Sequence, residues 1–259
     1  MKRLTGCLFL TLIVWATPFF AQTAPTDAAD CREEKIKIER YEKQLNDWAQ
    51  LARYREANAK LQPPAANENR VVFLGDSITD IWNLAEYFPG KSYVNRGISG
   101  QTTPQMLVRF RQDVIDLKPK AVVILAGTND IAGNTGPMTL EDIAQNLKSM
   151  VELAKANRIR VVLASVLPVN DRVKNKQGNL FIQTKKRPNE KIRALNDWIK
   201  NYAAENDLIY LDYYSATVDA EGTLKDGVSY DGLHPDAAGY KVMKTLAEEA
   251  IAKALRMKR

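Results

Sequence analysis

Val71-Val72-Phe73-Leu74 is an uninterrupted apolar run that leads directly into Gly75-Asp76-Ser77. Apolar runs without polar alternation are typical of strands that are buried on both faces, as in a parallel sheet. Similar short runs recur along the chain, with helical patterns between them, at Ser92–Val94, Ala121–Ala126, Arg160–Val166 and Leu208–Leu211. This alternation predicts an α/β fold, a three-layer α/β/α sandwich with a central parallel sheet of five strands.

Two segments carry the clearest helical patterns. Apolar residues recur at helical spacing from Leu140 to Ala154, and Thr139 with Asp142 matches a capping box at the start of that segment. A second apolar stripe runs through Asp236–Leu255, near the end of the chain. We expect both segments to pack against the sheet.

Polar clusters follow three of the expected strands. Gly75-Asp76-Ser77 comes after the first strand, Asn95–Gly100 after the second and Gly127–Asp130 after the third. A fourth polar segment, Asp231–His234, lies just before the last expected helix. Because parallel strands direct their carboxyl ends at one crevice, we expect all four segments to meet there.

The residue types in these segments suit acyl transfer by a serine nucleophile. The hydroxyl of Ser77 is a weak nucleophile unless a base takes its proton, and His234, the only histidine of the chain, is the candidate base. Asp231 stands three residues before His234 and can orient the imidazole. A single histidine argues against a histidine-rich metal site, so we expect neither a metal nor a cofactor.

Acyl transfer also needs hydrogen-bond donors for the oxyanion that forms on the carbonyl oxygen. The backbone amide of Ser77 would lie at the start of a helix, where amides are free. Gly100 lets a second amide approach closely, and the side-chain amide of Asn129 donates without a charge. Each residue alone also has a structural explanation, as a helix cap or a turn residue, so the hypothesis depends on their convergence.

These blocks resemble those of the SGNH hydrolase superfamily, also called GDSL esterases and lipases, over roughly Val71–Leu255. The resemblance implies a flavodoxin-like sandwich. It further implies a catalytic triad of Ser77, Asp231 and His234, and an oxyanion hole formed by Ser77, Gly100 and Asn129.

Within the superfamily, the chain looks most similar to compact exported acetylesterases and to members like platelet-activating-factor acetylhydrolase. Ile78-Thr79 stands where many members have Leu-Ser, a departure that leaves the triad and the oxyanion hole untouched. Thr79 also occupies the last glycine position of the Gly-x-Ser-x-Gly elbow, which argues against the α/β-hydrolase fold.

The resemblance implies an exported serine esterase that removes short acyl groups, above all acetyl, from hydroxyls of a carbohydrate or related glycan. A lipid esterase, either a lysophospholipase or a short-chain thioesterase, is an alternative. A noncatalytic glycan-binding protein on the same fold is another. Asp80, Trp82 and Asn83 follow the nucleophile and are candidates for the substrate pocket, with core packing as the alternative for the tryptophan.

The amino terminus predicts export. Residues 1–24 read as a signal peptide, with Lys2-Arg3 before a short apolar stretch over Leu8–Phe20. That stretch is too short for a stable membrane span, so we expect a periplasmic or extracellular protein, with a retained amino-terminal anchor as the alternative. Leu4-Thr5-Gly6-Cys7 imitates a lipoprotein cleavage box, but it precedes the apolar stretch, which favours coincidence. The mature chain would keep only Cys31, which excludes an intramolecular disulfide.

Residues 25–65 are expected to form a linker and one long amphipathic helix, from Asp30 to about Leu61, before a hydrolase domain at 66–259. We expect the apolar stripe of that helix to cover the core of the domain, with a coiled-coil arm as the alternative. The stripe comprises Ile38, Tyr41, Leu45, Trp48, Leu51 and Tyr54.

Charge and loop length complete the expectations. The net charge of +6 is scattered and forms no basic stripe, which argues against nucleic-acid binding. The resemblance to SGNH hydrolases implies a small ester or acylated glycan as the partner. Asn170–Pro188 is polar and unusually long for a connection without secondary structure. It follows the fourth strand and should overhang the carboxyl edge of the sheet, either as a functional loop or as a merely solvated one.

Overall fold

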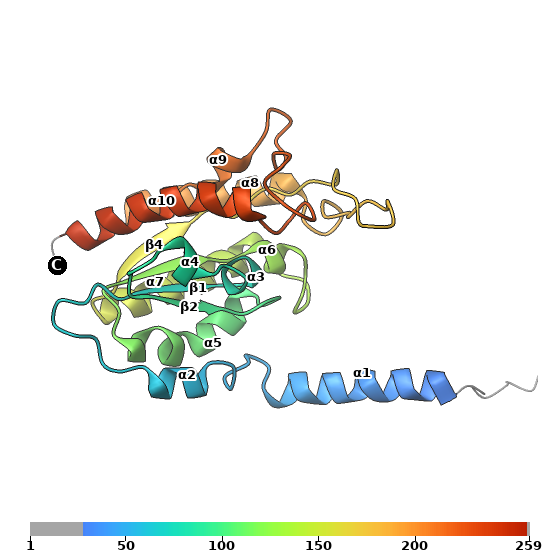
Figure 1. The fold of residues 1–259 in the computed structure, drawn as a ribbon, viewed down its shortest axis with the longest axis horizontal. Helices are drawn as coiled ribbons and strands as arrows, with labels where there is room; N and C mark the ends of the chain where they lie inside the picture. Colours follow the sequence, from blue (N-terminus) through green and yellow to red (C-terminus); the bar gives the residue numbers. More distant parts are fainter. Residues whose placement is uncertain (1–27, 258–259) are drawn as a thin grey trace, which may run out of the picture. The chain divides into compact units, whose positions relative to one another are not determined.

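The computed structural model describes residues 28–257, and it separates into a first unit that ends at Asn46 and a second unit, Asp47–Arg259 (Figure 1). The predicted signal peptide and the lipoprotein-like box at Cys7 lie outside the described residues. Within residues 28–257, no helix combines the length and the apolar character that a membrane crossing requires.

The first unit contains helix α1, Ala28–Asn46. Three members of the predicted apolar stripe, Ile38, Tyr41 and Leu45, are 56%, 62% and 80% exposed. These side chains are not buried within the first unit, and their packing against the domain stays a prediction.

The prediction of one long helix is wrong. The chain turns after Asn46, and the next helix, α2, spans Arg55–Lys60. The carboxylate of Asp47 accepts hydrogen bonds from the amides of Leu51 (2.7 Å) and Ala52 (2.9 Å). A side chain that binds nearby amides offers the backbone an alternative to the helical ladder. Gln50 adopts a left-handed conformation, with φ of 54°, which ends the helical path.

The turn between α1 and α2 belongs to the second unit, which thus begins before the predicted start at residue 66. Three glutamines, Gln101, Gln105 and Gln112, donate side-chain hydrogen bonds to carbonyl oxygens of this turn, with Gln112 reaching Leu51 at 2.8 Å. Gln105 reaches Trp48 at 2.6 Å, and Gln101 reaches Ala49 at 2.8 Å. These bonds hold residues 47–54 against the domain.

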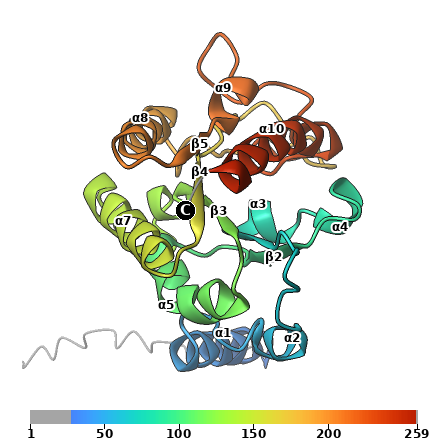
Figure 2. The same cartoon turned by 90° about the vertical axis from the view of Figure 1, so that its left-hand side faces the viewer.

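The second unit is built on a five-stranded parallel sheet in the order β2-β1-β3-β4-β5, as the sequence predicted (Figures 1 and 2). In register, Gly75 at the end of the first strand lies opposite both Gly97 and Leu125. The carboxyl ends of three strands therefore lie at one level. The strands are β1 (Val71–Gly75), β2 (Tyr93–Gly97), β3 (Ala121–Leu125), β4 (Arg160–Ala164) and β5 (Ile209–Leu211).

Helices cover both faces of the sheet, as Figure 2 shows end-on. Alternation along β1 sends Val72 and Leu74 to one face and Val71 and Phe73 to the other. The first face packs against α5 (Thr103–Asp113), α7 (Leu140–Ala156) and α8 (Asn189–Glu205). The second packs against α3 (Ser77–Asp80), α4 (Leu84–Tyr87), α9 (Tyr213–Thr217) and α10 (Ala237–Arg256).

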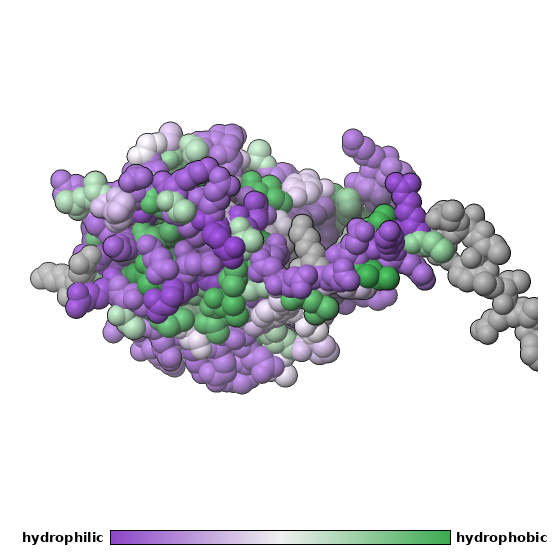
Figure 3. All heavy atoms as spheres, turned by 90° about the horizontal axis from the view of Figure 1, so that it is seen from below, coloured by the Kyte–Doolittle hydropathy of each residue, from purple (hydrophilic) through white to green (hydrophobic). Residues whose placement is uncertain are grey.

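Two short elements complete the unit, the 3-10 helix η1 (Ile115–Leu117) and α6 (Thr128–Ile131). The predicted capping box is present at the start of α7, where Thr139 Oγ1 accepts from the Asp142 amide at 3.1 Å and Asp142 accepts from the Thr139 amide at 2.9 Å. Hydrophilic residues predominate on the face in Figure 3, with hydrophobic residues in smaller groups between them.

Candidate active site

Ser77, His234 and Asp231 form a continuous hydrogen-bonded chain. The Oγ atom of Ser77 lies 2.9 Å from Nε2 of His234, and Nδ1 of His234 lies 2.6 Å from Oδ2 of Asp231. The other carboxylate oxygen, Oδ1, accepts from the backbone amides of Leu233 (3.0 Å) and His234 (2.7 Å). The structure thus brings together the three side chains that the sequence predicted to meet.

A sharp turn from β1 into α3 places Ser77. The strand ends at Gly75, where a Cβ would lie only 2.2 Å from Oγ1 of Thr79 and 2.8 Å from the carbonyl oxygen of Leu125. Only glycine allows so close an approach. Asp76 then caps α3 by accepting from the Ile78 amide at 3.0 Å. Ser77 is therefore the first residue of the helix.

A tight loop before α10 carries the Asp231–His234 pair. Gly232 has a φ of +80°, and a Cβ there would lie 2.2 Å from the carbonyl oxygen of Asn170. The Asn170 amide in turn donates to the carbonyl of Gly232 at 2.9 Å. The ring of Tyr230 stacks on that of His234, with 5.7 Å between centroids. His234 is thus held in a loop, as expected from the proline that follows it.

The electrostatics of the pair favour an ionised carboxylate. Burial by itself raises the pKa of Asp231, but the hydrogen bonds from the ring and backbone of His234 outweigh it, and the pKa lies below its usual value. An ionised Asp231 accepts from Nδ1–H, so the neutral imidazole presents Nε2 as an acceptor to the Ser77 hydroxyl.

Three residues, Ser77, Gly100 and Asn129, were predicted to supply hydrogen-bond donors for an oxyanion. Asn129, in α6 after β3, is buried, and its Nδ2 donates one hydrogen bond to the Gln101 carbonyl at 3.1 Å. The other Nδ2 hydrogen remains for an incoming oxygen. Gly100 has a φ of +80°. Within residues 28–257, the backbone amides of Ser77 and Gly100 donate to no acceptor.

The three residues suggested for the substrate pocket have structural contacts. Trp82 is 3% exposed and stacks on Tyr240 with 5.2 Å between centroids, so it is a core residue, the alternative that the sequence left open. Asp80 accepts from the backbone amide of Ser99 (3.1 Å) and its hydroxyl (2.7 Å). Asn83 caps α4. A role of Asp80 or Asn83 toward substrate stays a prediction.

The long loop over residues 170–188 reaches the site, as its position after β4 predicted. Asp171 accepts from the amides of Gln183 (2.6 Å) and Thr184 (2.9 Å), which closes the loop at its base. Gln183 Nε2 donates to the carbonyl oxygen of Asp231 at 3.1 Å. The loop is therefore bound to the segment that carries His234, and is not merely solvated.

Arg187, from the same loop, is the residue that the sequence did not single out. Its Nη2 donates to Oδ1 of Asn129 at 3.1 Å, and the side chain is buried. Burial lowers its pKa, while the charges of Asp76 and Asp231 act in the opposite direction. Two exposed lysines, Lys185 and Lys186, directly precede it, so its charge alone gave no signal.

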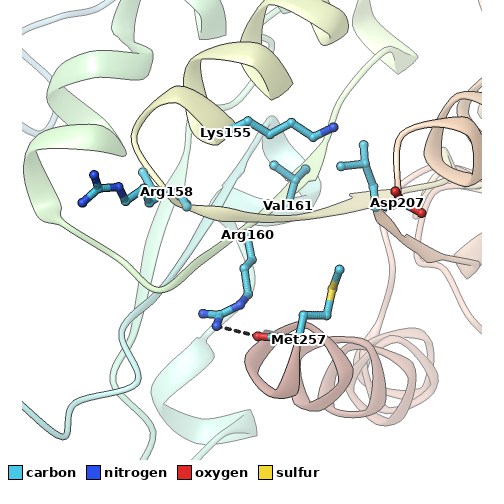
Figure 4. Close-up of a pocket in the computed structure, with 8 residues that line it drawn as sticks. Lys155, Arg158, Arg160, Val161, Asp207 and Met257 are labelled. Atoms are coloured by element: carbon cyan, nitrogen blue, oxygen red, sulfur yellow. Dashed lines mark hydrogen bonds between the residues drawn. The ribbon is translucent and has the colours of Figure 1, made fainter. Parts of the chain in front are cut away.

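A separate cavity of about 380 Å³ lies at the opposite edge of the sheet, around the start of β4 (Figure 4). Arg160 and Arg158 line it together with Val161, and Arg160 Nη2 donates to the carbonyl of Met257 at 2.7 Å. Neither serine nor histidine lines this cavity. Among the described residues, no three histidine, cysteine, aspartate or glutamate side chains gather as a metal site would require.

Comparison with known proteins identifies the family. Residues 73–242 match the GDSL-like Lipase/Acylhydrolase family. An acetylxylan esterase of Geobacillus stearothermophilus is 24% identical over 207 residues, which cover 67% of this chain and 90% of that protein. The uncharacterized lipoprotein YqeF of Bacillus subtilis is 31% identical over 118 residues, 38% of this chain, so the match spans about half (49%) of the lipoprotein's length.

Solved structures agree with this assignment. A candidate acylhydrolase of Bacteroides fragilis is 45% identical, with a TM-score of 0.73, and the match covers 81% of this chain and 99% of that one. A candidate platelet activating factor of Streptococcus pneumonia is 25% identical, with a TM-score of 0.68, over 86% of this chain and 99% of that one.

The parallel sheet, the serine at the end of its first strand and the adjoining histidine define a serine ester hydrolase. The chain belongs to the GDSL-like lipase/acylhydrolase family, as its resemblance to SGNH hydrolases predicted.

Proposed function

We propose that this protein is an exported esterase that removes short acyl groups, above all acetyl, from hydroxyls of a carbohydrate or related glycan. The observation that carries the proposal is the hydrogen-bonded chain from Ser77 through His234 to Asp231. The backbone amides of Ser77 and Gly100, which donate to no acceptor among the described residues, support it. The substrate is a small ester or an acylated glycan, and the reaction needs no cofactor.

In the first half of the reaction, Ser77 Oγ attacks the ester carbonyl carbon while Nε2 of His234 takes the hydroxyl proton. The carbonyl oxygen becomes an oxyanion and accepts from the amides of Ser77 and Gly100 and from Nδ2 of Asn129. The intermediate collapses, His234 returns its proton to the departing alcohol, and the acyl group remains on Ser77.

In the second half, His234 takes a proton from water, and the resulting nucleophile attacks the acyl-enzyme. The same donors hold the second oxyanion. Collapse releases the short carboxylic acid, and the proton on His234 returns to Ser77. Asp231 stabilises the imidazolium that forms in both halves, since its carboxylate accepts from Nδ1 throughout.

The acetyl and carbohydrate preference is supported by the acetylxylan esterase among the relatives. The Streptococcus protein, named for a platelet activating factor, keeps a lipid esterase as the second candidate. The two differ in their response to acyl length. A glycan deacetylase has its highest kcat/KM on acetylated sugars, whereas a lipid esterase gains kcat/KM as the acyl chain lengthens.

Hydrolysis of p-nitrophenyl acetate by the wild type and by Ser77→Ala tests the esterase proposal. We expect the variant to lose roughly 10³-fold or more in kcat, because removing a triad member leaves only binding and the oxyanion donors. Equal rates would reduce the protein to a noncatalytic binding module. A panel of acetylated xylo-oligosaccharides and lysophospholipids, ranked by kcat/KM, then separates the two substrate classes.

Export is supported by the basic Lys2-Arg3 before the apolar stretch, and one relative is a lipoprotein. Mass spectrometry of the mature protein, isolated from cells that produce the full chain, tests it. A new amino terminus near residues 21–24 agrees with a cleaved signal peptide. Lipid attached to Cys7 would instead make the protein membrane-anchored and would contradict our interpretation of the cleavage box.

A further inference from the structure

Arg187 is a buried cation that forms no ion pair among the described residues. Its side chain is 8% exposed, and its Nε atom is buried without a hydrogen-bond partner. Burying a guanidinium without a carboxylate partner costs free energy. The contact of this buried group with Asn129, a predicted oxyanion donor, points to a functional role.

The contact of Arg187 determines how the Asn129 amide is oriented. Nη2 of Arg187 lies 3.1 Å from Oδ1 of Asn129, and Nδ2 of Asn129 lies 3.1 Å from the carbonyl oxygen of Gln101. A guanidinium only donates and a carbonyl only accepts. A flipped amide would therefore place donor against donor and acceptor against acceptor. These two partners leave a single orientation, in which the second Nδ2 hydrogen is free.

A second side chain holds Arg187 in place. Oε1 of Gln183 accepts from Nη1 of Arg187 at 3.4 Å, while Nε2 of Gln183 donates to the Asp231 carbonyl at 3.1 Å. The loop therefore contacts both halves of the site, the Asn129 amide and the segment of the catalytic acid. Pro188 restricts the backbone of Arg187 to extended conformations and begins α8 directly after it.

We propose that Arg187 is a positioning residue of the oxyanion hole, which orients the Asn129 side-chain amide so that Nδ2 donates to the developing oxyanion. This inference rests on the proposed esterase function and deepens it. Arg187 itself touches neither substrate nor nucleophile in this role. It acts through Asn129.

The proposal makes a kinetic prediction. An oxyanion exists in the transition state but not in the ground state, so a donor aimed at it affects kcat more than KM. The guanidinium on Oδ1 also polarises the amide and strengthens its N–H donors. Loss of Arg187 should therefore lower kcat, by less than the loss of Asn129 itself.

A double-mutant cycle on p-nitrophenyl acetate tests this role. We expect Arg187→Met to lower kcat about 10- to 100-fold with little change in KM, and Asn129→Ala to lower it about 10²- to 10³-fold. Because Arg187 acts through Asn129, the double variant should match Asn129→Ala to within about twofold. Lys186→Met, the neighbouring exposed cation, is the matched control and should keep wild-type kinetics. Losses that simply multiply in the double variant would overturn the proposal.

The pH profile of kcat separates this positioning role from an electrostatic role of Arg187. If the arginine acted through its charge on His234, Arg187→Met would shift the acid limb of the kcat profile to higher pH. A positioning role leaves the midpoint of the acid limb in place, so a shift of that midpoint would count against the proposal.

If Arg187→Met does not fold, as judged by circular dichroism, Arg187→Lys is made in the wild-type and Asn129→Ala backgrounds. This pair answers the same question, since the ammonium keeps the charge but not the planar fork.

The Ser77→Ala baseline separates the two proposals. Wild-type rates equal to those of Ser77→Ala would overturn the esterase function, and the inference with it. A Ser77-dependent esterase whose kcat is unchanged in Arg187→Met would overturn the inference alone.

Discussion

The two edges of the sheet carry opposite chemistry. At the carboxyl edge, α3 and α6 begin, and the polar side chains in and next to these helices include Asp76, Ser77 and Asn129. At the amino edge of β4, helices end instead, and the side chains around the cavity in Figure 4 include Lys155 and Arg160. The difference follows from the direction of the helices in a parallel α/β fold.

Helix ends explain the distribution. The first amides of a helix are free donors and favour negative charge, whereas its last carbonyls favour cations. Lys155 Nζ donates to the carbonyl of Asn206, the C-cap of α8, at 2.9 Å, and Arg160 donates to the carbonyl of Met257, the C-cap of α10. Lys155 and Arg160 therefore have a structural use, because they bind carbonyls at helix ends. The free donors of the carboxyl edge remain available for an oxyanion.

The largest expected effect comes from Asp231→Asn. Both amides that bind Oδ1 would keep the single oxygen of the asparagine, so its NH₂ group would face Nδ1 of His234. The imidazole would then carry its proton on Nε2 and could not accept from Ser77. We expect kcat to fall about 10⁴-fold, as for the wrong tautomer in a serine triad.

Asp226→Asn is the matched control for this change, because Asp226 is an exposed carboxylate in the same segment, paired with Arg172 at 2.7 Å. Its kcat on p-nitrophenyl acetate should stay near the wild-type value. A similar loss in both variants would mean that the segment as a whole, and not the tautomer, sets the rate.

Much of this site could be predicted from the sequence, because two simple patterns determine it. Apolar runs such as Val71–Leu74 identify buried parallel strands, and parallel strands bring their following loops to one edge. That rule alone places Ser77 near Asn129. His234 needed one step more, the recognition that the Asp231–His234 block precedes the last helix.

The features that the sequence did not predict depend on three-dimensional contacts, which apolar spacing and motifs do not show. The apolar spacing continues through Asp47, but the hydrogen bonds of its carboxylate to Leu51 and Ala52 break the helix there. Arg187 looks in the sequence like Lys185 and Lys186 before it. Only the burial of Arg187 distinguishes it from them, and burial depends on how the loop closes on itself through Asp171.

Asp76 should make the stability of the carboxyl edge depend on pH. Burial raises its pKa from 3.8 to about 6, so folding favours the protonated form. This contribution to stability is fully present below about pH 3.8 and is lost as the pH rises through about 6. Relative to Asp76→Asn, the wild type should lose about 2 kcal/mol of unfolding free energy between pH 4 and pH 7.

Urea denaturation of both proteins at several pH values measures this difference. Contributions from groups that titrate alike in the two proteins cancel in the difference between their unfolding free energies. Asparagine can still cap α3 by accepting from the Ile78 amide. A difference that does not change with pH would show that Asp76 ionises as easily in the folded chain as in the unfolded one.

Gly232→Ala tests the contact between the histidine loop and residue 170. Alanine is strained at a φ of +80°, and its Cβ would lie 2.2 Å from the carbonyl oxygen of Asn170. We expect a loss of about 2 kcal/mol in unfolding free energy or more, together with lower kcat, because the loop must shift. Gly227→Ala is the control, since its φ of +75° imposes similar strain but nothing lies within 4 Å of the added Cβ. Equal losses in the two variants would mean that strain alone, and not the Asn170 contact, matters.

The smallest effect is expected at the amino edge, from Arg160→Met. The substitution removes the hydrogen bond to the Met257 carbonyl, but it also removes an Nε atom that is buried without a partner. These two changes oppose each other, so unfolding free energy measured in urea should change by no more than about 1 kcal/mol. The kcat on p-nitrophenyl acetate should equal that of the wild type, because Arg160 lies at the amino end of β4, whereas Ser77 follows the carboxyl end of β1. A tenfold loss of kcat in a folded Arg160→Met protein would show that the two edges are coupled and do not have separate structural and catalytic roles.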